Sequence, residues 1–263
     1  LLKVTVSTAP LVPDAPRTTI VTSEEPASNA ALGFVGGDSK KQFNENSAIQ
    51  PLDWYYHNKE LTYSFNNHGH RSKNFEDIDQ DNYILFTGCS HTMGVGLELE
   101  KTYPYIVSKE LGVDYYNLAM PATGIDVVEY NLLTWFFTRI KKPKLIIVQW
   151  PDHSRYIEYD FKIQRGLERG SWNTEPDKFP FIVNAEDTGM FYARKNMTYR
   201  LLNTSSPSPI IPFNFGNQQD YGMHDLHMPT LDKARDLSHA GIKSHDMFSK
   251  TLLNHIEVNG LIK

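Results

Sequence analysis

Three short apolar runs, each ending at or just before a glycine or proline, constrain the fold of this chain most. They are NYILFTG at 82–88, VDYYNLAM at 113–120 and KLIIVQW at 144–150. Apolar runs of this length that stop at turn residues are typical of buried parallel strands. Helical patterns lie between them, TYPYIVSKEL at 102–111 and IDVVEYNLLTWFFTRI at 125–140. The alternation predicts βαβ units, and hence an α/β fold in which helices cover both faces of a parallel sheet.

Two further segments extend the pattern toward the C-terminus. IIPFNF at 210–215 is a candidate strand, and residues 242–256 form a candidate amphipathic helix. In open parallel sheets, ligands bind at the carboxyl ends of the strands. We therefore expect the chemistry in the loops at 88–96, 121–125 and 149–155.

Composition narrows the class of protein. Of the 263 residues, 40% are hydrophobic and 22% charged, which provides a sizeable core and argues against wholesale disorder. The 26 basic and 31 acidic residues give a net charge of −5, so no nucleic-acid partner is expected. The single cysteine, Cys89, excludes a disulfide framework and multi-cysteine metal centres. Neither a membrane span nor a signal peptide is predicted, and the compartment is left open.

The N-terminal residues differ from the rest of the chain. Residues 1–48 are rich in Ser, Thr, Ala and Asn, and they contain Pro10, Pro13, Pro16 and Pro26. Prolines at this density disfavour helices and central strands. We expect an extended arm with short strands at KVTV and TTIV, followed by a main domain at 49–263. The arm is interpreted either as a flexible tail or as a contact with a partner or a second copy of the chain.

The loop after the first predicted strand carries the first candidate for chemistry. It reads Gly88-Cys89-Ser90-His91-Thr92-Met93-Gly94-Val95-Gly96. A serine on a glycine-flanked turn between a buried strand and a helix is held out at the edge of the sheet, beside backbone amides that stabilise an anion. An acyl-transfer nucleophile needs this arrangement. The alternatives are an ordinary capping serine, or Cys89 as the nucleophile.

A second candidate lies near the C-terminus, in Asp236-Leu237-Ser238-His239. A turn with this spacing lets the carboxylate reach the histidine ring. That contact fixes the tautomer and leaves the other ring nitrogen for a serine. Asp-x-x-His is common by itself, and it becomes informative in combination with a strand-end serine and a parallel sheet.

Together these motifs resemble the SGNH (GDSL-type) hydrolases. GCSHTMGVGLELEKTYP at 88–104 is similar to the family's nucleophile block, and NLAMPATG at 117–124 to its second block. DLSHAGIKSH at 236–245 is similar to the C-terminal Asp-x-x-His block. The resemblance implies a flavodoxin-like three-layer α/β fold and a serine esterase that needs no metal or cofactor.

Residue by residue, the resemblance assigns Ser90 as nucleophile, His239 as general base and acid, and Asp236 as the group that orients His239. It also assigns the backbone amides of Ser90 and Gly124 to the oxyanion hole. Small acyl groups are the implied substrates, and an acetylated glycan is the ester substrate that we expect.

Two departures from the family pattern concern this site. Cys89 stands where the best-known form has Asp, at a position that supports the loop and does not attack. Pro151 stands where the family supplies an Asn side chain to the oxyanion hole. Candidates for substrate contact or oxyanion support are Gln149, His153, Arg155 and His91. The alternative is a catalytically weak or inactive SGNH-like module that binds within a larger assembly.

Histidine pairs elsewhere have spacings that are compatible with metal ligation. They are His68-x-His70 and His224-x-x-His227. Ten histidines in one chain make such spacings common by chance, so solvated loop histidines are the expectation and no metal site is predicted.

Overall fold

The computed structural model describes residues 30–151, 155–160, 165–169, 185–215 and 226–262. The strands expected at KVTV and TTIV lie outside the described residues. None of the helices in the described ranges is long and apolar enough to cross a membrane.

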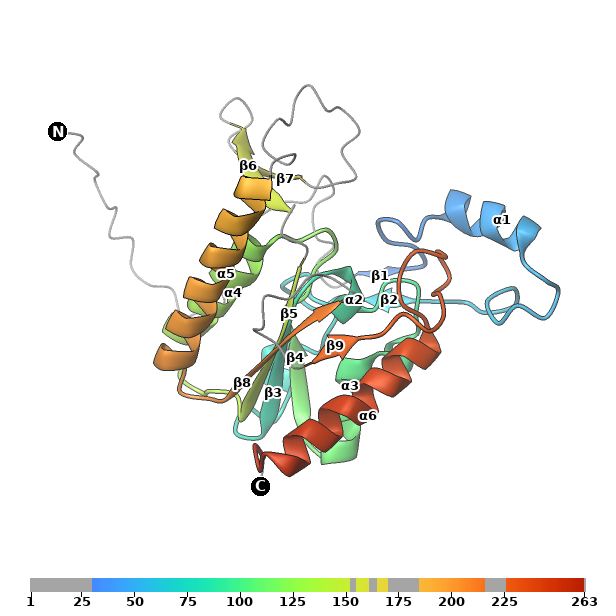
Figure 1. Ribbon diagram of the computed structural model, residues 1–263. Coiled ribbons are helices and arrows are strands. Elements are labelled where there is room, and N and C mark those ends of the chain that lie inside the picture. Colours follow the sequence, from blue (N-terminus) through green and yellow to red (C-terminus); the bar gives the residue numbers. More distant parts are fainter. Residues whose placement is uncertain (1–29, 152–154, 161–164, 170–184, 216–225, 263) are drawn as a thin grey trace.

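A five-stranded parallel sheet forms the centre of the molecule (Figure 1). Its strands are β3 (Tyr83–Thr87), β4 (Asp114–Asn117), β5 (Leu145–Trp150), β8 (Ile210–Phe215) and β9 (His227–Met228). They are arranged in the order β4-β3-β5-β8-β9, and each neighbouring pair is parallel. The four longer strands coincide with the predicted ones, whereas β9 was not predicted.

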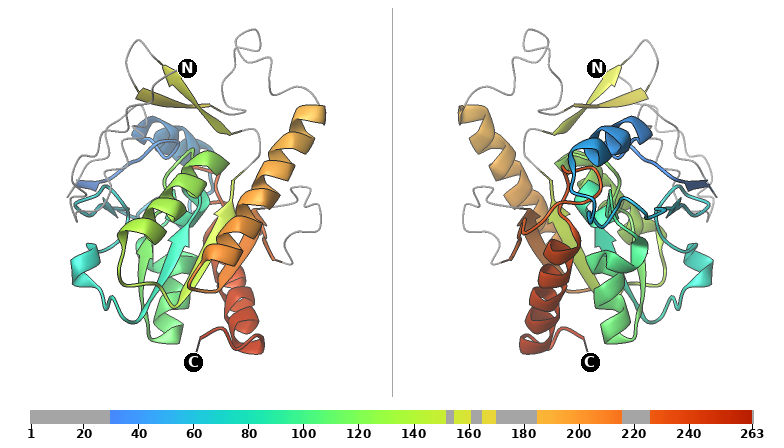
Figure 2. Two further views of the ribbon diagram at one scale, coloured as in Figure 1. Left: turned by 90° about the vertical axis from the view of Figure 1, so that its left-hand side faces the viewer. Right: turned by 90° about the vertical axis from the view of Figure 1, so that its right-hand side faces the viewer.

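Helices cover both faces of this sheet (Figure 2). On one face lie α4 (Ile125–Thr138) and α5 (Ala185–Ser205), and on the other α3 (Tyr103–Leu111) and α6 (Ile242–Val258). The predicted three-layer α/β fold is therefore confirmed. The predicted helices at 102–111, 125–140 and 242–256 agree with α3, α4 and α6, whereas α5 was not predicted.

The strands alternate their side chains between two apolar clusters, because successive residues of a strand point to opposite faces. One cluster packs Leu85, Ile146 and Val148 against α4 and α5 through Val128, Leu132, Trp135 and Leu202. The other packs Ile84, Phe86 and Ile147 against α3 and α6 through Tyr103, Val107, Phe248 and Leu252. Each large apolar side chain buried in this way stabilises the fold by roughly 1.5–3 kcal/mol.

Shorter elements surround the carboxyl end of the sheet. They are β1 (Ala31–Leu32), α1 (Lys40–Ile49), β2 (Tyr63–Ser64), α2 (Ser90–Met93) and an antiparallel hairpin of β6 (Tyr156–Asp160) and β7 (Arg165–Arg169). Strand β1 pairs antiparallel with β2. Single 3-10 turns occur at Phe75–Asp77 and Leu99–Lys101.

Part of the expected N-terminal arm is described, and it has regular structure. Residues 31–49 contain β1 and α1, and the Ser39 hydroxyl accepts a hydrogen bond from the Gln42 amide at the start of α1. The extended conformation that we expected from the prolines and small polar residues of this region is therefore wrong for residues 40–48, which are helical. The boundary between 48 and 49 stays a prediction.

Two local details concern the end of β4 and the start of α3. The strand predicted at 113–120 ends at Asn117, because the Asn117 carboxamide accepts from the Ala119 amide and donates to the Thr92 carbonyl. Thr102 is the N-cap residue of α3, and its hydroxyl donates to the Leu99 carbonyl. The Tyr103 amide donates to Nδ1 of His245, so a histidine from α6 satisfies the start of α3.

Buried histidines give the fold a dependence on pH. Burial lowers the pKa of His70 from its ordinary 6.5 to about 4, and that of His245 to about 3. In the unfolded chain the same rings take up protons below about pH 6.5. The stability that these histidines contribute is therefore complete above that pH and is lost as the pH falls toward the folded-state values.

We expect the free energy of unfolding to fall by roughly 2 kcal/mol for each of these two histidines between pH 7 and pH 5. Urea unfolding followed by tryptophan fluorescence at the two pH values measures the difference. In the variant His70→Gln, the fall in the free energy of unfolding between pH 7 and pH 5 should be smaller by the contribution of His70. An unchanged difference in the variant would show that His70 is not the titrating group.

Candidate active site

Ser90 lies at the turn that joins β3 to the short helix α2. Gly88 has φ 154°, and a Cβ at this position would lie 2.5 Å from Thr92 Oγ1 and 2.6 Å from the Gln149 Cβ. Only glycine fits such a conformation and such a close approach. Cys89 is the extended N-cap residue, and Ser90 is the first residue of α2. The sequence Gly-Cys-Ser therefore forms a tight turn that holds Ser90 at the carboxyl end of β3.

Gln149, on the neighbouring strand β5, holds this turn through hydrogen bonds of its side chain. Its Oε1 accepts from Thr92 Oγ1 at 2.6 Å and from the Cys89 amide at 3.3 Å, and its Nε2 lies 3.2 Å from Cys89 Sγ. The Tyr103 hydroxyl in turn donates to Thr92 Oγ1 at 2.9 Å. Gln149 was predicted as a substrate or oxyanion contact, and in the structure its amide supports the turn that carries Ser90.

A loop between β9 and α6 brings Asp236 and His239 to Ser90. His239 Nε2 lies 2.7 Å from Ser90 Oγ. On the other side of the ring, Nδ1 of His239 contacts Oδ2 of Asp236. The loop geometry depends on Leu237, which has φ 57°, and on Asp236 Oδ1, which accepts the amides of Ser238 at 3.1 Å and His239 at 3.0 Å. Asp236, His239 and Ser90, which lies 149 positions from His239 in the sequence, thus form one hydrogen-bonded chain.

The electrostatics of this chain favour an ionised Asp236. Burial by itself would raise the pKa of the Asp236 carboxyl, but the hydrogen bond and charge of His239 and the two backbone amides lower it overall. The carboxylate is almost completely buried, whereas the His239 side chain keeps 16% of its surface exposed. The relay therefore has a protected anionic end and an end that solvent reaches.

His91 lies next to His239. Its ring stacks on Phe215 with centroids 3.6 Å apart and lies 4.8 Å from the ring of His239. Burial holds the pKa of His91 well below 6.5, and the nearby charges of His239, His245 and Arg155 lower it further. His91 is therefore a neutral ring at this site, and its predicted role in tuning the site or contacting substrate stays a prediction.

The loop at 120–124 lies beside the nucleophile turn. The Thr123 hydroxyl donates to the Gly88 carbonyl at 3.0 Å, and so ties the two loops together. Gly124 is the N-cap residue of α4, and a Cβ there would lie 2.6 Å from the Arg155 carbonyl oxygen. Close packing is thus one reason for glycine at 124, and its amide in the oxyanion hole stays a prediction. Ala122 in the same loop has a strained φ of 60°, which is not visible in the sequence.

The remaining candidates are distributed unevenly around the site. His153 lies outside the described residues. Arg155 follows the end of β5, where its charge acts on His91 and its backbone packs on Gly124. Cys89 is buried, with its thiol on the Gln149 amide, while Ser90 contacts His239.

Among the described residues, no group of three or more His, Cys, Asp or Glu side chains is placed to hold a metal ion.

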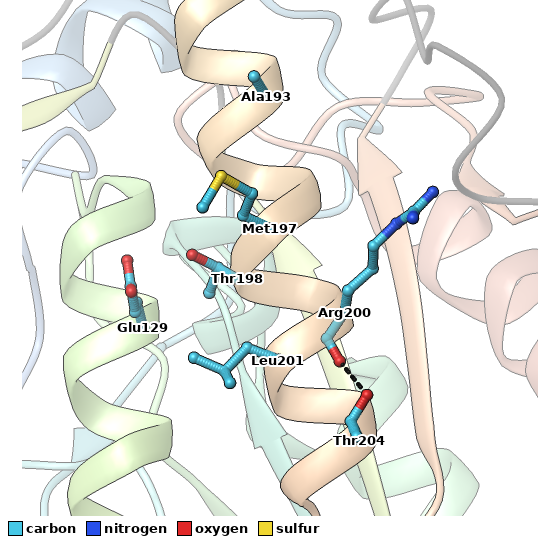
Figure 3. Close-up of a pocket in the computed structure, with 7 residues that line it drawn as sticks. All are labelled: Glu129, Ala193, Met197, Thr198, Arg200, Leu201 and Thr204. Carbon is cyan, nitrogen blue, oxygen red and sulfur yellow. Dashed lines mark hydrogen bonds between the residues drawn. The ribbon is translucent and has the colours of Figure 1, made fainter.

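A separate pocket of about 700 Å³ lies between α4 and α5 (Figure 3). It is lined by Glu129, Ala193, Met197, Thr198, Arg200, Leu201 and Thr204. None of the predicted site residues lines it. Figure 3 shows Glu129 on α4 across from Met197, Thr198 and Leu201 on α5. This hollow is thus separate from Ser90 and His239.

Comparison with known proteins gives matches in structure alone. No family model and no curated protein matches the chain. An acetyl xylan esterase, Est2A, from the rumen bacterium Butyrivibrio proteoclasticus matches with 16% identity and a TM-score of 0.47 over 69% of this chain and 65% of that one. A carbohydrate esterase family 2 enzyme from Corynascus thermopiles matches with 14% identity and a TM-score of 0.46, over 67% and 66%.

A protein of the G-D-S-L family from Desulfitobacterium hafniense matches with 11% identity and a TM-score of 0.25, over 68% of this chain and 74% of that one. The chain spans about two thirds of the length of the two esterases.

Replacing Asp236 by asparagine tests the hydrogen-bonded chain. Asp236→Asn keeps an oxygen for the two backbone amides but places an NH₂ group opposite Nδ1 of His239. Nδ1 must then accept, and Nε2 carries the proton that it would need to take from Ser90. We expect the kcat for hydrolysis of p-nitrophenyl acetate to fall about 10⁴-fold at pH 7.

The matched control is Asp81→Asn, which changes an exposed carboxylate paired with Lys141. It should keep the wild-type kcat. An Asp236→Asn protein that is folded and retains activity within about tenfold of wild type would contradict the orienting role of Asp236.

Proposed function

We propose that this protein is a serine ester hydrolase that works through a covalent acyl-Ser90. The observation that carries the proposal is the contact of 2.7 Å between Ser90 Oγ and His239 Nε2, with the opposite ring nitrogen of His239 on Asp236. A hydroxyl, an imidazole and a carboxylate in this order form a nucleophile, its base and the group that orients the base. The position at the carboxyl end of a parallel sheet is where such folds bind ligands.

In the proposed reaction, Ser90 Oγ attacks the ester carbonyl carbon while its proton moves to Nε2 of His239. The tetrahedral oxyanion collapses, the bond to the alcohol breaks, and His239 returns the proton to the leaving oxygen. Water then attacks the acyl-serine with His239 as base, and the acid product leaves with Ser90 restored. Asp236 stays ionised throughout and stabilises the imidazolium that forms in each half-reaction.

The oxyanion hole is proposed to consist of backbone amides. Ser90 and Gly124 are the donors that the motifs imply. The Gln149 amide is engaged with Cys89 and Thr92, which supports a role for Gln149 in holding the turn, and its predicted role in the oxyanion hole stays a prediction. Arg155 is the charged candidate for side-chain support in the described residues. Removing one such donor typically costs about 10²–10³ in rate.

A carbohydrate O-acetyl ester is the substrate class that we propose. The resemblance to the SGNH hydrolases implies small acyl groups, and acetylated xylan is a polymer that tests this class directly. The second candidate function is an inactive or weak binding module. The engaged Gln149 and the proline at 151 favour it, because a hole built from amides alone stabilises the oxyanion less.

Labelling with a fluorophosphonate probe distinguishes the two candidates. We expect the wild-type protein to be labelled, because the probe reacts with a serine that an adjacent imidazole activates. Ser90→Ala should abolish labelling and lower hydrolysis of p-nitrophenyl acetate by roughly 10⁴–10⁶-fold. Gel fluorescence measures the labelling. The absorbance of released p-nitrophenolate, at about 405 nm, measures the hydrolysis.

Two controls accompany this experiment. Ser64→Ala removes an exposed hydroxyl on β2 and should leave labelling intact. Cys89→Ala should also remain labelled, whereas its loss of labelling would assign the nucleophile to the thiol. Absence of labelling in the folded wild type would favour the binding module.

A further inference from the structure

Arg235, which directly precedes Asp236, is buried and held by the N-terminal segment 31–49. Its guanidinium forms a bidentate ion pair with Asp38, with Nε–O distances of 3.0 and 3.1 Å and an Nη2–O distance of 2.7 Å. The two side chains are 3% and 0% exposed. The guanidinium also lies 4.5 Å from the ring centroid of Phe34 and 5.4 Å from that of Phe43. The N-terminal segment thus encloses one side chain of the loop that carries Asp236 and His239.

The same segment also holds the backbone of Arg235. Asn46, on α1, donates from Nδ2 to the Arg235 carbonyl at 3.1 Å. The Arg235 amide donates to the Gly96 carbonyl at 3.1 Å, on the loop that follows α2. Figure 1 shows the loop between β9 and α6 lying next to the segment that contains β1 and α1. Both faces of the Arg235 peptide are therefore fixed by elements outside its own loop.

A ring of hydrogen bonds connects this ion pair with the nucleophile side of the site. The Tyr63 hydroxyl donates to Asp38 and accepts from the Gly96 amide at 2.7 Å. Gly96 lies six positions after Ser90, and Arg71 fixes this stretch by donating to the carbonyls of Met93, Gly94 and Leu97. Through Asp38, Tyr63, Gly96 and Arg235, the loop with the base and the loop with the nucleophile share one buried network.

The segment also lies directly against the catalytic carboxylate. A Cβ on Gly37 would lie 3.8 Å from Asp236 Oδ2, and one on Gly36 would lie 3.9 Å from the Pro121 Cβ. Gly36 and Gly37 therefore lie close to the loop at 120–124 and to the loop of Asp236, respectively. The oxygen nearest to Gly37 is Oδ2, which is also the oxygen that contacts Nδ1 of His239.

We propose that Asp38 is a positioning residue of the active site, and that the segment 31–49 completes that site by fixing the loop of Asp236 and His239 through Arg235. The proposal rests on the function proposed above. A buried charge that loses its partner is strongly unfavourable, so the loop moves when Asp38 is neutralised. A displacement of the order of 1 Å at a reacting group costs about 10²-fold in rate. Asp38, Tyr63, Gly96 and Arg235 all lie outside the central five-stranded sheet.

Asp38→Asn, in the full-length protein, is the first test. We expect kcat for p-nitrophenyl acetate to fall by about 10–10²-fold, with KM changed by less than about threefold, because the substrate contacts remain. Far-UV circular dichroism and a cooperative urea transition confirm that the variant is folded. Asp246→Asn, which changes an exposed pair with Lys250 on α6, is the matched control and should keep the wild-type kcat. A folded Asp38→Asn protein with a kcat within about threefold of wild type overturns the proposal.

Hydrogen exchange provides a readout that does not depend on activity. In Asp38→Asn, the Ser238 and His239 amides, which are bonded to Asp236 Oδ1, should exchange at least about tenfold faster, while the amides of β3 keep their protection. Equal exchange in variant and wild type overturns the proposal even if the wild type proves to be inactive. An inactive wild type with the expected exchange pattern refutes the esterase function and leaves the positioning contact standing.

A milder variant keeps the test decisive if Asp38→Asn does not fold. Asn46→Ala removes the hydrogen bond to the Arg235 carbonyl and leaves the ion pair in place. We expect a drop in kcat of about 3–10-fold at unchanged KM, with faster exchange at 238–239. Wild-type kcat and exchange in this variant would overturn the proposal.

Discussion

The parallel register of β3 and β5 is the constraint on which the site depends. Thr87 lies opposite Val148, so the chain leaves the sheet at Gly88 directly beside Gln149. One buried carboxamide from β5 can therefore hold the Cys89 amide, the Cys89 thiol and the Thr92 hydroxyl together. A shift of one residue in the register would turn the Gln149 side chain to the other face of the sheet and leave the turn without this support. The position of Ser90 is thus decided by strand pairing as much as by its own loop.

The sequence allows prediction of those parts of the fold whose residues carry their own signal. Strands β3, β5 and β8 are apolar runs bounded by turn residues, and α4 and α6 have amphipathic or apolar patterns, so their positions follow from periodicity. Helix α5 and the β6–β7 hairpin were missed because their sequences mix polar and apolar residues without a clear period. Helix α1 was missed because its pattern is polar and the prolines before it suggested an extended arm.

The candidate site likewise contains residues that the sequence identifies and residues that it does not. Ser90, Asp236 and His239 stand in short motifs, so their residue types and spacing alone suggest a role, and that role stays a proposal. The support of the site has no such signal. Asp38 and Arg235 are 197 positions apart, and no local pattern indicates that they pair. The role of Gln149 in the turn and the strained φ of Ala122 are likewise consequences of tertiary packing.

An ion pair serves this position better than apolar packing would, for a geometric reason. Apolar contacts are non-directional, and neighbouring side chains repack with little change in energy. The guanidinium of Arg235 presents a planar fork that matches a carboxylate in a bidentate arrangement. Together with the rings of Phe34 and Phe43, Asp38 leaves the side chain of Arg235 a single orientation.

Because Asp236 is the next residue, that orientation limits where its carboxylate can lie, and so where His239 meets Ser90. The network also keeps the charge of the Asp38–Arg235 pair apart from that of the Asp236 carboxylate. Asp38 and Arg235 neutralise each other, which leaves Asp236 as the carboxylate on which the ring of His239 depends. A charged pair that is buried next to a catalytic carboxylate, and balanced within itself, fixes the loop without adding a net charge beside the proton relay.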